Sequence, residues 1–277
     1  MSPSEPDWRR RNRARWDELV GVHLGPGGYH LSDLRAGRGR LNPIEEGELP
    51  PVAGLRILHL QCHFGADTLR LAQRNATVVG LDFSTQAIAA ARNLAAELGL
   101  ARRASFVEAD LYHAPATVPQ PHQFDLVYVT WGALCWLPDI AHWARIVAAM
   151  LRPGGTLYLA EGHPAALVFD DAARDKEGRP GWFAPYFGRQ PIVMDNPADY
   201  TDSEAKLEHA GEITWVHPLA DILGGLLAAG LSLVSFNEHA AVPWRMFDTL
   251  ERGPDRLWRW PDKSWLPLSF SLRAERR

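Results

Sequence analysis

Between residues 55 and 163, short apolar runs alternate with segments whose apolar residues have helical spacing. Buried parallel strands read as continuous apolar runs, and strands that alternate with helices form βαβ units around a doubly wound sheet. We therefore expect an α/β fold with a mostly parallel sheet and helices on both faces. The predicted strands are residues 55–61, 77–83, 104–111, 124–131 and 156–163, and the helices between them are 66–75, 84–100 and 139–155.

The flanking regions have a different character and suggest four parts of one domain. Residues 1–50 begin with a predicted helix over 7–20, capped by Asp7, and continue as an irregular arm rich in Gly and Pro. Residues 51–163 form the alternating core. Residues 164–216 interrupt the alternation with many aromatic residues, which argue against disorder. Residues 217–277 supply the last elements, which are a helix over 217–230 and strands over 231–240 and 266–275.

The composition argues against nucleic-acid-binding, secreted and membrane proteins. The chain of 277 residues is 46% hydrophobic and 22% charged, with a net charge of −4, which does not favour nucleic acid or an anionic membrane as a partner. The basic run Arg9–Arg15 is interpreted as a solvated helix face, with a basic lid over an anionic ligand as the alternative. The N-terminus lacks a signal-peptide core, and no apolar run approaches the ~20 residues of a membrane span. We expect a cytoplasmic monomer or homodimer.

The stretch HLQCHFGADTL, which follows the first predicted strand, allows three interpretations: a cofactor turn, a metal site or a catalytic thiol. Cys62 and His63 are adjacent, so their side chains point apart in an extended turn. The only other cysteine is Cys135, and zinc sites need more ligands at set spacings. A cysteine at a strand end is usually a small buried residue. We therefore expect no metal and no catalytic thiol, and Gly65 becomes the informative residue.

Four motifs then follow in order: ILHLQCHFG (57–65), VVGLDFS (78–84), FVEADLY (106–112) and LRPGGTLYL (151–159). The series resembles the class I S-adenosylmethionine-dependent methyltransferases over about residues 55–160, and the pattern of 217–275 fits the last two strands of that family. The resemblance implies a Rossmann-like, seven-stranded sheet with an N-terminal helical lid and an insert after strand five. It also implies a core at 51–163 that binds S-adenosyl-L-methionine and yields S-adenosyl-L-homocysteine.

Asp82 and Asp110 are the main cofactor residues that this resemblance implies. A carboxylate at a strand end can accept both ribose hydroxyls, and Asp110 with the Leu111 amide can bind adenine; the alternative for each aspartate is a turn or a helix cap. The chain departs from the family at the first turn, where His59 takes the acidic position and Gln61 and His63 replace the first two glycines. The full set of candidate cofactor residues is Tyr29, Gln61, His63, Gly65, Asp82, Phe83, Asp110, Leu111 and Trp131.

Methyl transfer from a sulfonium is an in-line displacement in which alignment contributes roughly 7–11 kcal/mol. A general base adds ~10²–10⁴-fold for a weakly acidic acceptor. Our first candidate base is His163, with a histidine bonded to backbone as the alternative. Glu161 is the second candidate and could instead contact a substrate amine, and His217 is a third.

Aromatic residues predict the acceptor. Trp136, Trp182 and Tyr186 suggest a pocket for a small, planar or aromatic molecule of secondary metabolism, with plain core packing as the alternative. Arg245 could pair with a substrate carboxylate or close a surface salt bridge. Two other functions stay open at this point: an enzyme of the same fold that performs a different reaction, such as a cyclase or decarboxylase, and a non-catalytic scaffold that binds the cofactor.

Overall fold

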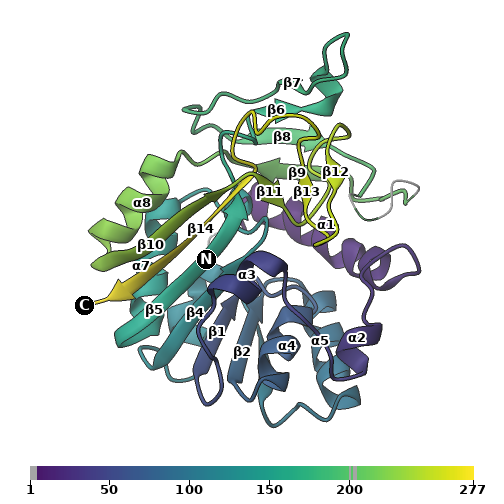
Figure 1. The fold of residues 1–277 in the computed structure, drawn as a ribbon. Coiled ribbons are helices and arrows are strands. Elements are labelled where there is room, and N and C mark those ends of the chain that lie inside the picture. The colour runs from purple at the N-terminus through teal and green to yellow at the C-terminus, as the bar shows by residue number, and fades with distance from the viewer. Residues whose placement is uncertain (1–4, 200, 202–204) are drawn as a thin grey trace.

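A seven-stranded sheet forms the centre of the computed structural model, which describes residues 5–199, 201 and 205–277 (Figure 1). Six strands are parallel, and β14 is antiparallel to both of its neighbours. The predicted α/β class with a mostly parallel sheet is therefore confirmed. In spatial order the strands are β10 (Leu231–His239), β14 (Ser269–Arg276), β5 (Leu151–Gly162), β4 (Phe124–Thr130), β1 (Arg56–Leu60), β2 (Thr77–Asp82) and β3 (Ala104–Glu108).

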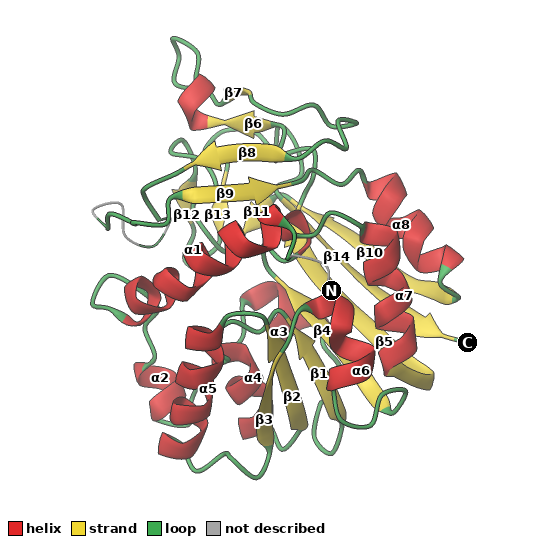
Figure 2. Ribbon diagram, turned by 180° about the vertical axis from the view of Figure 1, so that it is seen from behind, coloured by secondary structure: helices red, strands yellow, loops and turns green. Residues whose placement is uncertain are grey.

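Helices cover both faces of this sheet (Figure 2). Successive strand residues point to opposite faces, so Ile57 and Leu58 of β1 belong to two separate hydrophobic clusters. The Ile57 cluster includes residues of α4 (Ala66–Gln73) and α5 (Thr85–Glu97). The Leu58 cluster includes residues of α6 (Ala114–Thr117), α7 (Ile140–Met150) and α8 (Leu219–Ala228).

The boundary between α7 and β5 differs from the prediction, which extended the helix to residue 155. The helix ends at Met150, and β5 begins at Leu151 and runs through Pro153. Proline disfavours a helical residue before it, which explains the early end. Gly155 then approaches the neighbouring strand so closely that a Cβ there would lie 2.7 Å from the Phe124 carbonyl oxygen.

The N-terminal helix α1 (Asp7–Leu24) lies across the end of the sheet at which the parallel strands finish (Figures 1 and 2). The following arm contains only two short helices, α2 (Ser32–Arg35) and α3 (Pro43–Glu48). The insert forms two hairpins, of β6 (Phe169–Asp170) with β7 (Gly181–Trp182), and of β8 (Ile192–Asp195) with β9 (Gly211–Thr214).

A third small sheet was not predicted because its two-residue strands carry no readable periodicity. It contains β11 (Ala241–Val242), β13 (Trp258–Arg259) and β12 (Glu251–Arg252). Three 3₁₀ turns complete the described elements, at Leu111–His113, Leu134–Trp136 and Asp171–Ala173. In the part of the chain that the structure describes, no helix has both the length and the apolarity needed to cross a bilayer.

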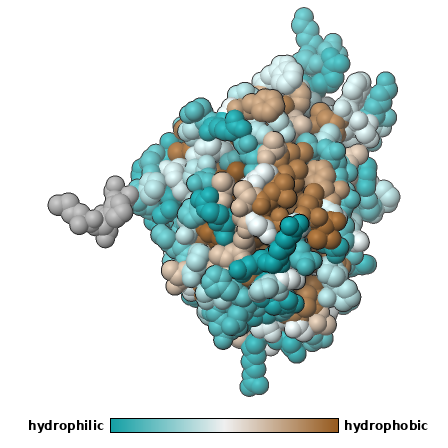
Figure 3. All heavy atoms as spheres, turned by 90° about the vertical axis from the view of Figure 1, so that its left-hand side faces the viewer, coloured by the Kyte–Doolittle hydropathy of each residue, from teal (hydrophilic) through white to brown (hydrophobic). Residues whose placement is uncertain are grey.

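One face of the molecule, on the side where α8 and the edge strand β10 lie, carries apolar side chains (Figure 3). The large exposed apolar residues of these two elements are Leu227, Leu233 and Val234. An edge strand of this kind can pair with another chain. The expectation of a monomer or homodimer stays a prediction.

Gly65, at the start of α4, has a left-handed backbone with φ of 76°, and a Cβ there would lie 2.6 Å from the Phe106 ring. We expect Gly65→Ala to lower the free energy of unfolding in urea by about 2–4 kcal/mol, from backbone strain plus overpacking. Gly54→Ala is the matched control, because Gly54 has φ of 80° but no atom within 4 Å of the added Cβ. A loss as small at Gly65 as at Gly54 would contradict the close contact.

Candidate active site

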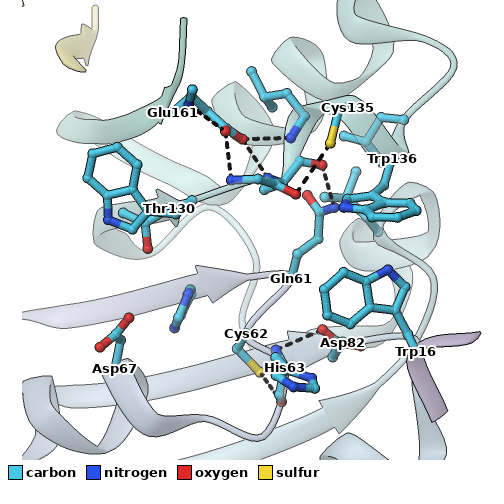
Figure 4. Close-up of a pocket in the computed structure, with 18 of the residues that line it drawn as sticks. Trp16, Gln61, Cys62, His63, Asp67, Asp82, Thr130, Cys135, Trp136 and Glu161 are labelled. Atoms are coloured by element: carbon cyan, nitrogen blue, oxygen red, sulfur yellow. Dashed lines mark hydrogen bonds between the residues drawn. The ribbon is translucent and has the colours of Figure 1, made fainter. Parts of the chain in front are cut away.

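A cavity of about 500 Å³ opens at the carboxyl ends of β1, β2 and β4, where open α/β sheets bind their ligands (Figure 4). All nine candidate cofactor residues line it, as do Glu161, Trp136 and His217. These twelve residues are about a third of the 36 that line the cavity. The nine cofactor candidates are Tyr29, Gln61, His63, Gly65, Asp82, Phe83, Asp110, Leu111 and Trp131.

The turn after β1 keeps a glycine-like backbone with only one glycine. Gln61 and His63 have φ of 54° and 51°, in the left-handed region that costs other residues roughly 1–2 kcal/mol each. The Gln61 Nε2 donates to the Ala133 carbonyl oxygen at 2.9 Å, whereas its Oε1 is buried without a hydrogen-bond partner. The side chain of Gln61 thus links the turn to the loop after β4 and leaves an acceptor unused beside the cavity.

Cys62 in the same turn is a buried core residue. A Cβ on Gly80 would lie 2.8 Å from its Sγ, and burial raises the pKa of the Cys62 thiol well above its usual value. Such a thiol is a poor nucleophile at neutral pH. Among the described residues, no group of three or more His, Cys, Asp or Glu side chains could hold a metal ion.

Asp82, at the end of β2, is buried and connects that strand to the turn. Its Oδ2 accepts from the His63 amide at 2.8 Å, and its Oδ1 accepts from the Ser84 amide at 2.9 Å. Burial raises the pKa of Asp82 to about 6, although the amides that donate to it oppose this shift. The carboxyl is therefore mostly ionised at neutral pH, and each oxygen retains a further acceptor position.

Asp110, after β3, has two contacts within the protein. Its Oδ1 accepts from the Tyr112 amide at 2.8 Å, as a cap of the 3₁₀ turn, and its Oδ2 lies 2.7 Å from Arg9 Nε. The helix-cap interpretation of Asp110 thus coexists with its position in the cavity wall. Arg9 brings α1 against the end of β3.

Arg9 and Arg15 show that the interpretation of the basic run as a solvated helix face was wrong for these two residues. Arg15 is buried, and its Nη1 donates to the carbonyl oxygens of Asn196 at 2.5 Å and Ala210 at 3.2 Å. Its Nε lies 3.1 Å from Glu212 Oε2. Arginine can satisfy several acceptors with one planar group, which suits a contact between a helix and an irregular insert.

Both oxygens of the Glu161 carboxylate accept hydrogen bonds from backbone amides. Its Oε1 accepts from Ala133 at 2.6 Å and Leu134 at 2.7 Å, and its Oε2 accepts from Gly132 at 2.7 Å and Gly162 at 3.2 Å. Burial raises the pKa of Glu161, and these amides oppose the shift. This arrangement makes Glu161 the anchor of the loop after β4 and does not support a role as a base.

The two candidate histidines lie in different places. His163 does not line the cavity: its Nδ1 accepts from the Ala165 amide at 3.1 Å, and its Nε2 lies 3.0 Å from Glu238 Oε1. This position corresponds to the backbone-bonded alternative. His217 does line the cavity, its Nε2 donates to the Leu137 carbonyl oxygen at 2.8 Å, and burial lowers the pKa of His217.

Three predicted substrate residues lie outside the lining. Trp182 is 80% exposed and stacks on Phe169 with ring centroids 4.8 Å apart. The Tyr186 hydroxyl accepts from the Leu219 amide at 3.0 Å. The Arg245 Nη2 donates to the Asp248 carbonyl oxygen at 2.6 Å, which is the surface alternative for that residue. None of the three lines the described cavity.

Tryptophans from outside the core, which we did not predict as site residues, form much of the aromatic wall. Trp16 of α1 contacts the rings of His63 and Trp136, with centroids 5.2 and 5.3 Å apart, and Figure 4 shows it facing the turn. The only available signal was an aromatic residue on an otherwise basic helix. The additional tryptophans of the lining are Trp8, Trp16, Trp215 and Trp244.

A buried chain of polar groups joins the turn, α1 and the insert. His63 Nε2 lies 2.8 Å from His23 Nδ1, and His23 Nε2 lies 3.2 Å from Asp199 Oδ2. Burial and the neighbouring His23 lower the pKa of His63 well below its usual value. The chain holds three distant segments together at one side of the cavity.

These features define an α/β protein with a nucleotide-sized pocket at the ends of its parallel strands. Comparison with known proteins agrees with this class of fold and site. The model of a methyltransferase domain family matches residues 57–155. The 27-O-demethylrifamycin SV methyltransferase of Amycolatopsis mediterranei (strain S699) is 32% identical over 148 residues, which cover 52% of this chain and 53% of that protein. A ubiquinone biosynthesis O-methyltransferase of Aeromonas salmonicida (strain A449) is 33% identical over 107 residues, covering 39% and 43%.

Solved structures show the same fold over most of the chain. An S-adenosylmethionine-dependent methyltransferase from Mesorhizobium loti has a TM-score of 0.59 at 24% identity, and the match covers 84% of this chain and 96% of that one. A structure described as a putative enzyme of this kind from Listeria monocytogenes has a TM-score of 0.61 at 17% identity, covering 88% and 98%. Residues 57–155 thus match a methyltransferase domain family, and the chain shares the fold of solved S-adenosylmethionine-dependent methyltransferases. It aligns with about half the length of the curated relatives.

Proposed function

We propose that the chain transfers a methyl group from S-adenosyl-L-methionine to a small, planar acceptor. The observation that carries the proposal is one cavity that combines the Gly65 turn, the buried Asp82 and the Asp110–Leu111 strand end with aromatic walls. When bound, the cofactor supplies an electrophilic methyl group on a sulfonium. The residues of this chain then bind, orient and exclude water.

The residues present fit this cofactor. Gly65 lines the cavity, and the absence of a Cβ lets the turn pack directly against the Phe106 ring behind it. Asp82 offers an anionic acceptor for ribose hydroxyls, and the Gln61 Oε1 is a buried acceptor without a partner. A cavity of about 500 Å³ lies in the range of sites that hold drug-sized ligands.

The aromatic walls and the named relatives support the choice of acceptor. Trp16, Trp136 and Trp215 line the cavity and suit a flat molecule. Two relatives are named as O-methyltransferases or as acting on an O-demethyl compound, which favours a hydroxyl group as the methylated position. A cytoplasmic location stays a prediction.

His217 is the proposed proton acceptor among the three candidate bases. It lines the cavity, and donation from Nε2 to the Leu137 carbonyl oxygen leaves Nδ1 unprotonated in the neutral ring. Burial lowers the pKa of His217, so the neutral form predominates at physiological pH. Its role would be to take the proton of an acceptor hydroxyl at Nδ1.

Titration calorimetry with S-adenosylmethionine and S-adenosylhomocysteine tests the cofactor assignment. Transfer of labelled methyl to a panel of hydroxylated aromatic compounds tests the reaction. Failure of both ligands to bind would overturn the whole proposal. Binding without transfer to any member of the panel would overturn the reaction and favour a non-catalytic or non-methylating protein.

The affinity for S-adenosylhomocysteine should depend on pH through Asp82. The ionised carboxylate is the better acceptor for ribose hydroxyls, and the pKa of Asp82 is about 6. We expect the affinity to be constant above about pH 7 and to fall as the pH drops through 6, by up to tenfold per pH unit. Calorimetry between pH 5 and 8 measures this. Asp82→Asn cannot ionise and should show a flat, weaker profile; an unchanged slope in that variant would assign the titration to another group.

A further inference from the structure

The charged side chains that line the cavity differ in how they are already satisfied. Asp82 and Glu161 accept from backbone amides, and Asp110 pairs with Arg9. Arg70 of α4 is the only Lys or Arg among the lining residues within the described ranges. Its one ion-pair partner there is Asp67, which also lines the cavity. The pair is therefore the only place in this lining where both signs of charge meet.

The geometry of the pair leaves hydrogen-bonding positions on both Asp67 and Arg70 available to a ligand. Arg70 Nη1 lies 2.6 Å from Asp67 Oδ1, and the two side chains are 17% and 24% exposed. The Arg70 Nε is buried and has no hydrogen-bond partner. Asp67 is the second residue of α4, where the helix dipole favours an anionic group. A ligand with an ammonium and a carboxylate could bind both residues without leaving a charge unpaired.

His59, the neighbouring residue of β1, supplies no competing charge. Its Nδ1 lies 2.8 Å from Thr68 Oγ1, and burial lowers the pKa of His59 to about 4. His59 and Asn42 both line the cavity beside the pair. With a neutral histidine at the end of β1, the carboxylate available at this end of the cavity is that of Asp67.

The pair is also separated from the proposed ribose residue. Figure 4 shows Asp67 to the left of Gln61 and Asp82 to its right, with Thr130 and Glu161 above them. The cavity therefore has one polar end at Asp82 and Asp110, and another at Asp67 and Arg70. A ligand with a nucleoside at one end and a zwitterion at the other matches this distribution of charge.

We propose that Asp67 and Arg70 hold the amino-acid end of the cofactor, with Asp67 accepting from its ammonium and Arg70 donating to its carboxylate. The proposal rests on the proposed function. It places the acidic group on the first turn of α4, whereas the end of β1 carries the neutral His59. Charge-assisted hydrogen bonds of this kind are stronger than neutral ones, so the pair should contribute strongly to affinity.

The test compares two ligands by titration calorimetry: S-adenosylhomocysteine and 5′-methylthioadenosine, which lacks the amino-acid group. We expect the wild-type chain to bind the first more tightly. Asp67→Asn and Arg70→Gln should each weaken S-adenosylhomocysteine by tenfold or more and change 5′-methylthioadenosine less than twofold. Glu97→Gln is the control, because Glu97 belongs to an exposed pair with Arg35 and should change neither affinity.

The outcomes separate this proposal from the proposed function. An equal loss for both ligands in the variants would make the pair structural, and unchanged affinities would also overturn the assignment. No binding of either ligand to the wild type would overturn the proposed function itself. Asp67→Glu keeps the charge and should retain the preference for S-adenosylhomocysteine. It decides the question if Asp67→Asn does not fold, because loss of the preference in a folded Asp67→Glu chain would contradict the proposal.

Discussion

Asp82→Ala should weaken the binding of S-adenosylmethionine and S-adenosylhomocysteine by at least about 100-fold. The change removes the acceptor proposed for the ribose hydroxyls, and hydrogen bonds to a charged group contribute ~1.5–3 kcal/mol each. Two such bonds correspond to roughly 10²–10⁴-fold in affinity. It also leaves the amides of His63 and Ser84 without their acceptor, which loosens the turn that faces the cavity.

Titration calorimetry at pH 7.5 measures the effect, with the free energy of unfolding of each variant recorded in parallel. Asp33→Ala is the control, because Asp33 is exposed and pairs only with Arg38 on the surface among the described contacts. Asp82→Asn keeps one carbonyl acceptor and should give an intermediate loss. An affinity of Asp82→Ala within threefold of wild type would refute the ribose role.

Glu161→Ala should lower the free energy of unfolding by about 3–5 kcal/mol. Four backbone amides, of Gly132, Ala133, Leu134 and Gly162, donate to this one buried carboxylate and would lose their acceptor together. Each buried donor left unpaired costs roughly 1–3 kcal/mol, partly recovered if water enters from the cavity. Denaturation in urea at pH 7 measures the change.

The same experiment separates the two roles considered for Glu161. A base that only removes a proton would lower turnover and leave the unfolding transition in place, whereas an anchor of the loop after β4 lowers both. Glu251→Ala, at an exposed position in β12, controls for the loss of one surface charge. A stable Glu161→Ala chain with low turnover would restore the interpretation of Glu161 as a base.

The core could be predicted from the sequence because its signals are local and repeated. Continuous apolar runs identify strands that are buried on both faces, and residues just after such strands share one edge of the sheet. Gly65 and Asp110 lie just beyond β1 and β3, and Asp82 is the last residue of β2, so their convergence on one cavity needed no long-range information. The fold class and the position of these three residues in the cavity wall could therefore be predicted, and their role in binding the cofactor stays a prediction.

The candidate catalytic and substrate residues could not be placed from the sequence, because their positions depend on which way irregular segments turn. His163 is only one residue beyond β5, yet its ring points away from the cavity towards Glu238. Trp182 and Tyr186 lie in a segment with two-residue strands, where no periodicity assigns a face. Trp16 is 45 residues before Gln61 in the sequence and still meets the turn, a contact that only the packed structure shows.

Asn12 of α1 gives the helix an unusual attachment to the insert. Its side-chain amide donates to the Ile213 carbonyl oxygen and accepts from the Ile213 amide, both at 2.8 Å, so it imitates a neighbouring strand along the edge of β9. The helix and the hairpin consequently share one free energy of local opening, since neither can separate without exposing unpaired polar groups of the other. Because Trp8 and Trp16 of α1 line the cavity, a ligand that packs against them should raise the free energy of local opening for the helix and for the hairpin together.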